Sequence, residues 1–344
     1  CYNLSNMKTA FFGVKLWEEE YLKEKIAARQ LAIEPVFVKE ILTPEKLPAD
    51  RTAEIVSIFV DSKIDAVVLE ALPNTKMLAL RSTGYDNVET NVAQAKNIVV
   101  SNVPSYGENT VAEQAFALLL CLSRKIFQAY DQIKESGNFT VENLQGFDLK
   151  GKTIGVVGTG RIGRHSIQIA KGFGMTVIGY DPFPNKQLAI ELGFDYLPFD
   201  ELLSQSDIVT IHVPYSKNTH HLFNANSFSR AKKGFYLINT SRGPVVETTA
   251  LVTALKSGQV GGAGLDVLEE EGVIRDELDF IAHGRSEGHD LKTILANHVL
   301  IDLPNVVITP HNAFNTREAL QRILDTTLDN IAAFLAQTPI NLVK

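Results

Sequence analysis

The sequence is poor in cysteine, has no long apolar run and shows no excess of basic residues. Its two cysteines, Cys1 and Cys121, are too few for a disulfide framework and form no CxxC pair for zinc. The longest apolar run, Phe116–Leu122, is far shorter than the roughly 18 residues of a membrane span. Lys and Arg number 33 against 40 Asp and Glu, so no basic surface for nucleic acid is indicated. We therefore expect a soluble, cytoplasmic protein with neither a membrane nor a nucleic-acid partner.

The chain is long enough and apolar enough for about two folded domains. Its 344 residues compare with about 150 residues for a typical domain. A hydrophobic content of 45% is ordinary for a globular protein and too high for a disordered one. Cys1–Asn6 is polar and precedes a strand-like run that opens at Met7. We interpret Met7 as the natural start and residues 1–6 as an added segment.

The first third of the sequence alternates between short apolar runs and a helical pattern. Thr9–Val14 has the pattern of a strand, and Trp17–Leu31 has the apolar periodicity of an amphipathic helix. Further short strands are expected at Val36–Val38, Ala66–Leu69, Leu78–Ser82 and Ile98–Val100. Apolar strands separated by helices predict a parallel sheet that is covered on both faces.

A second unit of the same kind is expected after a long helix. Asn109 or Thr110 can cap a helix that runs through Ala112–Ala129. Strands and helices then alternate from Thr153–Val157 to a last strand at Val306–Ile308. This second unit also predicts a parallel sheet.

The end of the sequence predicts a discontinuous first domain. A long, polar stretch at Leu268–Leu303 is expected to be irregular, and the helix Thr316–Leu335 follows it without a sheet of its own. That helix is therefore expected to return to the first domain. The predicted fold is α/β, with two doubly wound parallel-sheet domains.

A glycine-rich turn stands between a predicted strand and a predicted helix. It consists of Gly158, Thr159, Gly160, Arg161, Ile162 and Gly163. In such a turn the first glycine permits a tight bend, the second lets a pyrophosphate approach the backbone, and the third lets the helix pack closely on the sheet. The N-terminus of the helix adds N–H groups and the positive end of its dipole. The motif alone is a weak signal, but this context favours a dinucleotide site.

Asp181 ends the next predicted strand, 18 residues after Gly163 (181 − 163). An acidic residue about 20 residues beyond the glycines can hydrogen-bond the ribose diol of NAD, and it would repel the 2′-phosphate of NADP. The following Pro182–Pro184 offers no arginine for that phosphate, so NAD is the expected cofactor. The alternative is that Asp181 only opens the turn at Pro182.

Polar side chains follow three later strands. Arg242 has a planar fork that suits a carboxylate, although a solvated surface arginine is the alternative. The next strand is followed by Glu269–Glu271, of which we interpret Glu269 and Glu270 as a solvated acidic turn. His311 follows the last strand, and a histidine beside a carboxylate is an effective acid or base at neutral pH. Ligands of open α/β sheets gather at the carboxyl ends of strands, which favours a common site.

Taken together, these motifs resemble those of the D-isomer-specific 2-hydroxyacid dehydrogenases, and within that family those of the D-lactate dehydrogenase branch. The resemblance extends over nearly the whole chain, from about Met7 to the last helix. The motifs that carry it, besides the glycine turn with Asp181, are Leu80–Asn87, Tyr106–Glu113, His212–Pro214, Asn239–Gly243, Gly264–Asp266 and Pro310–Phe314. An ordered set of this kind is far more specific than any one of its members.

The resemblance implies a role for individual residues. Arg242 would clamp the substrate carboxylate and polarise its 2-carbonyl, while Glu271 would orient His311 as the acid or base. Asp266 would hydrogen-bond the nicotinamide carboxamide. Substrate-binding residues would be Thr83 and Gly84 through their N–H groups, Tyr106 in the cleft and Phe314 as a pocket wall. Further cofactor-binding residues would be His212, Val213, Pro214 and Thr240.

The expected architecture is a Rossmann NAD-binding domain at 106–310, inserted into a flavodoxin-like substrate domain formed by 1–105 and 311–344. The expected reaction is the reduction of pyruvate by NADH to D-lactate. Two alternatives stay open: the same chemistry on larger 2-oxo acids or on glyoxylate and hydroxypyruvate, and a non-catalytic NAD sensor. A homodimer is expected through the apolar helix Ala112–Ala129. No metal site is expected, because His283, His289 and His298 lack metal-ligand spacing and are interpreted as surface residues.

Overall fold

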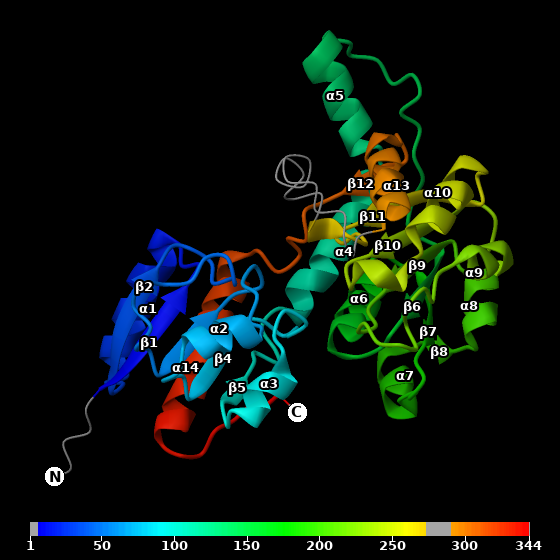
Figure 1. Cartoon of the computed structure of the whole chain (residues 1–344). Helices are drawn as coiled ribbons and strands as arrows, with labels where there is room; N and C mark the ends of the chain where they lie inside the picture. Colours follow the sequence, from blue (N-terminus) through cyan, green and yellow to red (C-terminus); the bar gives the residue numbers. More distant parts are fainter. Residues whose placement is uncertain (1–5, 273–289, 344) are drawn as a thin grey trace. The chain divides into compact units, whose positions relative to one another are not determined.

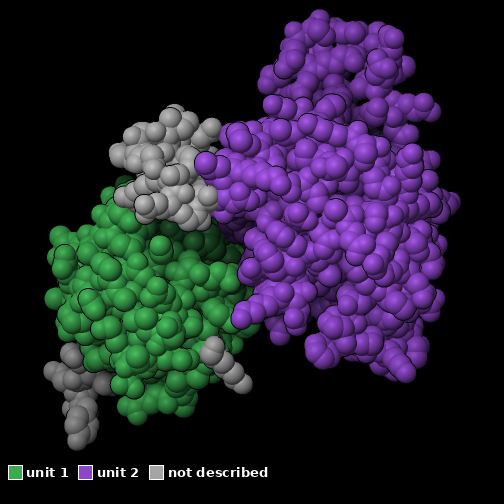
Figure 2. Space-filling model, turned by 45° about the vertical axis from the view of Figure 1, so that its right-hand side comes forward, with its two compact units in different colours: residues 1–107, 315–344 green, residues 108–314 purple. Residues whose placement is uncertain are grey.

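The computed structural model describes residues 6–272 and 290–343, and it divides into two compact units. Unit 1 comprises residues 1–107 and 315–344, and unit 2 comprises residues 108–314 (Figure 2). The chain thus leaves unit 1 once and returns to it at its C-terminal end. Each unit is an α/β domain built on a parallel sheet, which confirms the predicted fold class.

Unit 1 contains a five-stranded sheet within the described residues, in the order β2-β1-β3-β4-β5. Its strands are β1 (Met7–Phe12), β2 (Ile33–Val38), β3 (Ile55–Ile58), β4 (Met77–Leu80) and β5 (Val99–Ser101). Its helices are α1 (Leu16–Ala28), α2 (Ala66–Ala71), α3 (Thr90–Ala95) and α14 (Arg317–Leu335). All four strand pairs are parallel.

Helices cover both faces of this sheet (Figure 1). On one face, Leu22 of α1 and Leu328 of α14 pack with Phe11 of β1 in one buried cluster. On the other face, Val68 of α2 packs with Phe12, the next residue along the same strand. Successive residues of a strand point to opposite faces, so a run of apolar residues is needed when both faces are buried.

One segment that was predicted to be a strand is a helix. Ala66–Leu69 was expected to be a strand, but it lies in α2, whose first N–H groups are capped by Asp65 through a 3.1 Å bond from the N–H of Val68. The periodicity of so short an apolar run cannot separate a strand from a buried helix, whereas the cap selects the helix. The strand that was missed, Ile55–Ile58, lies at the centre of the sheet.

Unit 2 contains a seven-stranded parallel sheet within the described residues, in the order β12-β11-β10-β9-β6-β7-β8. Its strands are β6 (Thr153–Val157), β7 (Thr176–Tyr180), β8 (Asp195–Tyr196), β9 (Ile208–Ile211), β10 (Phe235–Asn239), β11 (Val260–Leu265) and β12 (Val306–Ile308). The strand order reverses between β6 and β9. In doubly wound sheets, ligands bind at such a switch point, outside the carboxyl ends of the strands.

The helices of unit 2 also lie on both faces of the sheet. Those within the described residues are α4 (Glu108–Ser123), α5 (Ile126–Ser136), α6 (Arg161–Gly172), α7 (Lys186–Leu192), α8 (Phe199–Gln205), α9 (Ala225–Arg230), α10 (Thr248–Lys256) and α13 (Leu291–Asp302), with a short 3-10 helix at Gly243–Val245. Val156 packs with residues of α4 and α6, while Val157 packs with residues of α8 and α10. None of the described helices has both the length and the apolar character of a membrane span.

Two element predictions in unit 2 were wrong. The expected single helix Ala112–Ala129 is broken, because the carbonyl of Ser123 accepts the N–H of Phe147 at 2.9 Å and Lys125 adopts a left-handed φ of 50°. The second part, α5, stands out from the rest of unit 2 (Figure 1), and none of its residues is buried. The stretch Leu268–Leu303, expected to be irregular, contains the helix α13.

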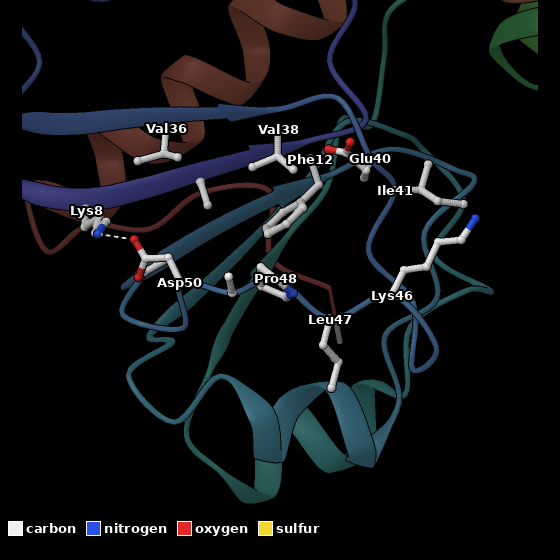
Figure 3. A pocket seen from close by; sticks show the side chains of 13 residues that line it. Lys8, Phe12, Val36, Val38, Glu40, Ile41, Lys46, Leu47, Pro48 and Asp50 are labelled. Carbon is white, nitrogen blue, oxygen red and sulfur yellow. Dashed lines mark hydrogen bonds and ion pairs between the residues drawn. The ribbon is translucent and has the colours of Figure 1, made fainter.

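Unit 1 also holds a pocket of about 360 Å³ between its sheet and the segment that follows β2 (Figure 3). Phe12, Val36 and Val38 give it an apolar wall, and Lys8 forms an ion pair with Asp50 at its edge. The residues that line this pocket include none of the predicted site residues.

Candidate active site

The three residues predicted to be catalytic follow three neighbouring strands of unit 2. Arg242 lies after β10, Glu271 after β11 and His311 after β12, and these strands are parallel and adjacent. Their carboxyl ends therefore meet at one edge of the sheet. Nδ1 of His311 lies 2.8 Å from Oε1 of Glu271, and the positive charge of Arg242 acts on the same carboxylate. The structure thus brings the three predicted side chains together.

Asp266, directly after β11, holds the loop that carries His311. Its side chain is almost fully buried, and its carboxylate accepts hydrogen bonds from the hydroxyl of Thr309 and from the N–H groups of Asn312 and Ala313. The N–H of His311 donates to the Asp266 carbonyl at 2.7 Å, and His311 has a left-handed φ of 49°. Burial raises the pKa of Asp266 above its ordinary value, although these hydrogen bonds act in the opposite direction.

The carboxylate of Glu271 holds the imidazole of His311 while both side chains stay in contact with solvent. They are 44% and 41% exposed respectively. Partial burial acts to raise the pKa of Glu271, but the hydrogen bond and charge of His311, the N–H of Leu268 and the charge of Arg242 together lower it. Glu271 is therefore ionised at neutral pH. Because Nδ1 of His311 is used by Glu271, Nε2 is the nitrogen available for proton exchange with a ligand.

A buried asparagine shapes the loop of Arg242. Oδ1 of Asn239 accepts the N–H and the hydroxyl of Ser241 at 3.0 and 2.8 Å, and Nδ2 donates to the carbonyl of Arg242 at 3.1 Å. Asn239 is only 1% exposed. The backbone of Arg242 is therefore fixed relative to the end of β10, and its guanidinium starts from a rigid turn.

The glycine-rich turn has the shape of a dinucleotide cradle at the start of α6. Gly158 has a φ of +92°, and a Cβ at this position would lie 2.7 Å from the carbonyl oxygen of His212. A Cβ on Gly163 would lie 2.1 Å from the carbonyl oxygen of Gly158. A Cβ on Gly160, in contrast, would meet no atom within 4 Å. The fold itself thus requires the first and third glycines, while the second faces open space that suits a pyrophosphate.

Asp181 lies beside this turn, and both of its carboxylate oxygens accept hydrogen bonds from neighbouring residues. One carboxylate oxygen of Asp181 accepts two hydrogen bonds from Thr159, from its N–H at 2.9 Å and from its hydroxyl at 3.1 Å. The other oxygen accepts the N–H of Phe183 at 2.9 Å. The hydroxyl of Tyr196 lies 2.7 Å from that of Thr159. Asp181 therefore does open the turn, as the alternative interpretation expected, and its contact with a ribose stays a prediction.

The other residues predicted to bind the cofactor surround the switch point of the sheet. Nε2 of His212 lies 2.8 Å from the hydroxyl of Ser166 in α6 and 3.0 Å from that of Thr210 in β9. Burial lowers the pKa of His212 to about 3, so the ring is neutral at physiological pH and adds no charge for a phosphate. Thr240 is 7% exposed, and its buried Oγ1 has no partner within the described part of the chain.

Three further cofactor-binding predictions differ in exposure. Val213 is buried, whereas Pro214 is exposed. Ile162 is partly exposed on the first turn of α6. The guanidinium of Arg161, on the same turn, lies 3.9 Å from the carboxylate of Glu108 and its side chain is 63% exposed. It adds a positive charge to the N-terminus of the helix.

The predicted substrate-binding residues belong to both units. Thr83, Gly84 and Tyr106 lie in unit 1, where the hydroxyl of Thr83 donates to the carbonyl of Val103 at 2.6 Å. Phe314 is the last residue of unit 2 and is partly exposed. The roles of all four stay predictions.

Sequence reasoning missed a buried carboxylate two residues before Glu271. Glu269 was expected in a solvated acidic turn, but it is 9% exposed and pairs with His221 at 2.7 Å. Three consecutive glutamates gave no signal that would separate one from the next. In the described residues no cluster of three metal-binding side chains occurs. His283 and His289 lie outside the described residues.

Comparison with known proteins identifies the family to which the chain belongs. The family model for the NAD-binding domain of D-isomer-specific 2-hydroxyacid dehydrogenases matches residues 116–313. A 2-hydroxyacid dehydrogenase homolog of Zymomonas mobilis is 40% identical over 329 residues, 95% of this chain and 96% of that protein. D-Lactate dehydrogenase of Escherichia coli is 36% identical over 330 residues, with 95% and 96% covered. A D-lactate dehydrogenase of Aquifex aeolicus in complex with NAD and lactic acid has a TM-score of 0.81 at 34% identity, with 96% of each chain covered.

The chain therefore belongs to the D-isomer-specific 2-hydroxyacid dehydrogenase family and is an NAD-dependent oxidoreductase.

The glycine turn gives a test that separates folding from cofactor binding. We expect Gly160→Ala to keep the free energy of unfolding and to weaken NADH binding at least about tenfold, because the methyl group enters space that the pyrophosphate needs. Gly158→Ala should instead lower the free energy of unfolding by about 1–3 kcal/mol through its strained φ and its contact with His212. Urea denaturation and NADH fluorescence titration measure the two quantities. Normal NADH affinity in Gly160→Ala would contradict the assigned cradle.

Proposed function

We propose that this enzyme reduces pyruvate to D-lactate with NADH, and that Arg242, Glu271 and His311 carry the reaction. The observation that carries the proposal is the 2.8 Å contact between His311 and Glu271, with the charge of Arg242 acting on the same carboxylate. The similarity to D-lactate dehydrogenases of Escherichia coli and Aquifex aeolicus supports the choice of substrate.

Arg242 anchors the substrate in this proposal. Its guanidinium can form two parallel hydrogen bonds with a carboxylate, which fixes the orientation of a small 2-oxo acid better than an ammonium group does. Its positive charge also polarises the adjacent 2-carbonyl group. Thr83 and Gly84 would add backbone N–H donors, and Tyr106 and Phe314 would set the size of substrate that is accepted.

His311 supplies the proton. Nicotinamide, when bound, supplies the hydride that reduces the carbonyl carbon. The carbonyl oxygen gains negative charge as this occurs, and Nε2 of protonated His311 donates a proton to it, which leaves a hydroxyl group and a neutral imidazole. Glu271 stabilises the protonated ring through Nδ1 and holds it in place. General acid catalysis of this kind contributes about 10²–10⁴-fold to a rate.

The cofactor side of the proposal assigns NAD to the glycine turn. The N–H groups at the start of α6 would bind the pyrophosphate, and Asp181 would take the ribose diol by exchanging its contact with Thr159. Asp266, besides holding the His311 loop, would accept a hydrogen bond from the carboxamide. His212, Val213, Pro214 and Thr240 would line the cofactor. The cytoplasmic location is kept as a prediction.

We also propose a homodimer that pairs through α4 and α5. On α5, Ile126, Phe127, Tyr130 and Ile133 are each between 43% and 58% exposed. A contiguous apolar surface of this kind on a soluble domain marks an interaction site. A twofold axis would let each copy cover the same face of the other.

A substrate panel tests the reaction itself. We expect NADH oxidation, followed at 340 nm, to give a higher kcat/KM with pyruvate than with 2-oxoisocaproate, phenylpyruvate, glyoxylate or hydroxypyruvate. A higher value with one of the other acids would replace pyruvate by that acid. An NADH signal that no 2-oxo acid changes would favour the non-catalytic NAD sensor.

Replacement of His311 tests the proton donor. We expect His311→Gln to lower kcat by about 10²–10⁴-fold with an unchanged Kd for NADH. Near-normal turnover in this variant would contradict the role of His311 as the proton donor.

The pH dependence tests the charge of Glu271. Because the pKa of Glu271 is lowered, its charge persists as the pH falls through the ordinary glutamate value of about 4.3. In a pH profile, the acid-side loss of kcat/KM that depends on Glu271 should therefore have its midpoint below that value.

Charge placed on α5 tests the dimer. We expect sedimentation equilibrium to give the mass of two chains for the unmodified protein and of one chain for Ile133→Glu, because the carboxylate would be buried without a partner. Asp131→Asn, which changes a polar residue of the same helix, serves as the control and should leave the dimer intact. A dimeric Ile133→Glu variant would exclude this surface.

A further inference from the structure

Glu269 forms a second histidine–carboxylate pair, two residues before the carboxylate that contacts His311. One of its oxygens lies 2.7 Å from Nε2 of His221, and the other accepts the N–H of Thr248 at 2.7 Å. Its carbonyl oxygen accepts Nδ2 of Asn297, a fully buried residue, at 2.6 Å. Since a carboxylate only accepts hydrogen bonds, Nε2 of His221 must carry the proton in this contact.

A left-handed residue separates the two carboxylates. Glu270 has a φ of 53°, which is uncommon for a residue with a side chain. Through this turn, Glu269 is directed into the interior and Glu271 toward His311. Their side chains are accordingly 11% and 44% exposed. The burial of Glu269 and the position of Glu271 are thus set by one backbone turn.

The same carboxylate segment also lies against the loop of Arg242. A Cβ on Gly243 would lie 2.0 Å from the carbonyl oxygen of Leu268 and 2.5 Å from the nitrogen of Glu269. The two backbones are therefore in direct contact at the residue next to Arg242. No side chain fits between them, so a shift of Glu269 moves Gly243 as well.

His221 is tied to that loop by its own backbone. The N–H of His221 donates to the carbonyl of Pro244 at 2.8 Å, and the N–H of the nearby Phe223 donates to the carbonyl of Val245 at 3.0 Å. The carbonyl of His221 accepts a hydrogen bond from Nδ2 of Asn224 at 2.8 Å. The ring of His220 stacks on the ring of His221, with centroids 3.9 Å apart. His221 and Glu269 thus join the segments 221–224, 243–248 and 268–271.

We propose that His221 and Glu269 are positioning residues that set Arg242 and Glu271 at the correct separation, through a pair that takes no part in the proton transfer. Because a misplacement of about 1 Å can cost about 10²-fold in rate, loss of the pair should lower the turnover number. The inference rests on the roles proposed for Arg242, Glu271 and His311.

The test compares two replacements of His221. Leucine removes the hydrogen bond to Glu269, whereas glutamine offers an amide N–H in its place. We expect His221→Leu to lower kcat at least tenfold and to raise the KM of the best 2-oxo acid, and His221→Gln to recover most of the kcat. The Kd for NADH should stay unchanged in both variants. His220→Leu removes the stacked ring but not the hydrogen bond, and it should retain kcat.

A signal that needs no substrate separates this inference from the proposed reaction. The Nδ1–H of His311, hydrogen-bonded to Glu271, should give a downfield proton resonance that is assigned by its loss in His311→Gln. We expect the resonance in the unmodified protein and in His221→Gln, and its weakening in His221→Leu. An unchanged resonance and unchanged kcat in His221→Leu would overturn the inference. So would a loss of kcat that His221→Gln fails to recover, because the ring would then act only in packing. Failure of every 2-oxo acid as a substrate would instead reject the proposed reaction.

Discussion

The rest of the site depends on the hydrogen bonds that the buried carboxylate of Asp266 accepts. It lies directly after β11 and accepts one O–H and two N–H groups from the loop that follows β12. A buried carboxylate is tolerated only when such donors use its lone pairs. Here the donors come from Thr309, Asn312 and Ala313, on both sides of His311. The imidazole is therefore held by a turn that is fixed at each end.

Similar contacts occur after the neighbouring strand β10 and further along the segment that follows β11. Asn239 after β10 binds the main chain of Ser241 and Arg242, and Glu269 after β11 binds the first N–H of α10. Asn239 is 1% exposed and the side chain of Glu269 is 11% exposed, whereas the side chains of Glu271 and His311 are 44% and 41% exposed. Buried polar groups thus set the geometry, and the groups assigned to the reaction can meet a substrate without being loosely held.

The sequence predicted the two parallel-sheet units and the glycine turn, because periodicity and motif context are local signals. Local signals also explain what it missed. The run Ala66–Leu69 is too short to separate a strand from a helix, and the cap from Asp65 decides between them. Glu269 could not be told from the glutamates that follow it, because its burial depends on the left-handed backbone of Glu270 and on a histidine 48 residues away in the chain. The glycine turn, Asp181, Arg242 and His311 were assigned from their motifs and their positions after strands. The roles of the other residues toward substrate and cofactor came from the family resemblance.

In the proposed reaction a hydride passes from NADH to the carbonyl carbon of pyruvate and D-lactate is formed. Its most direct measurement follows the reacting hydrogen, with NADH that carries deuterium at both positions of the nicotinamide C4. The lactate formed is analysed by NMR and by chiral chromatography. The account predicts D-lactate with one deuterium on C2. Lactate without deuterium on C2, or the L-enantiomer, would contradict it.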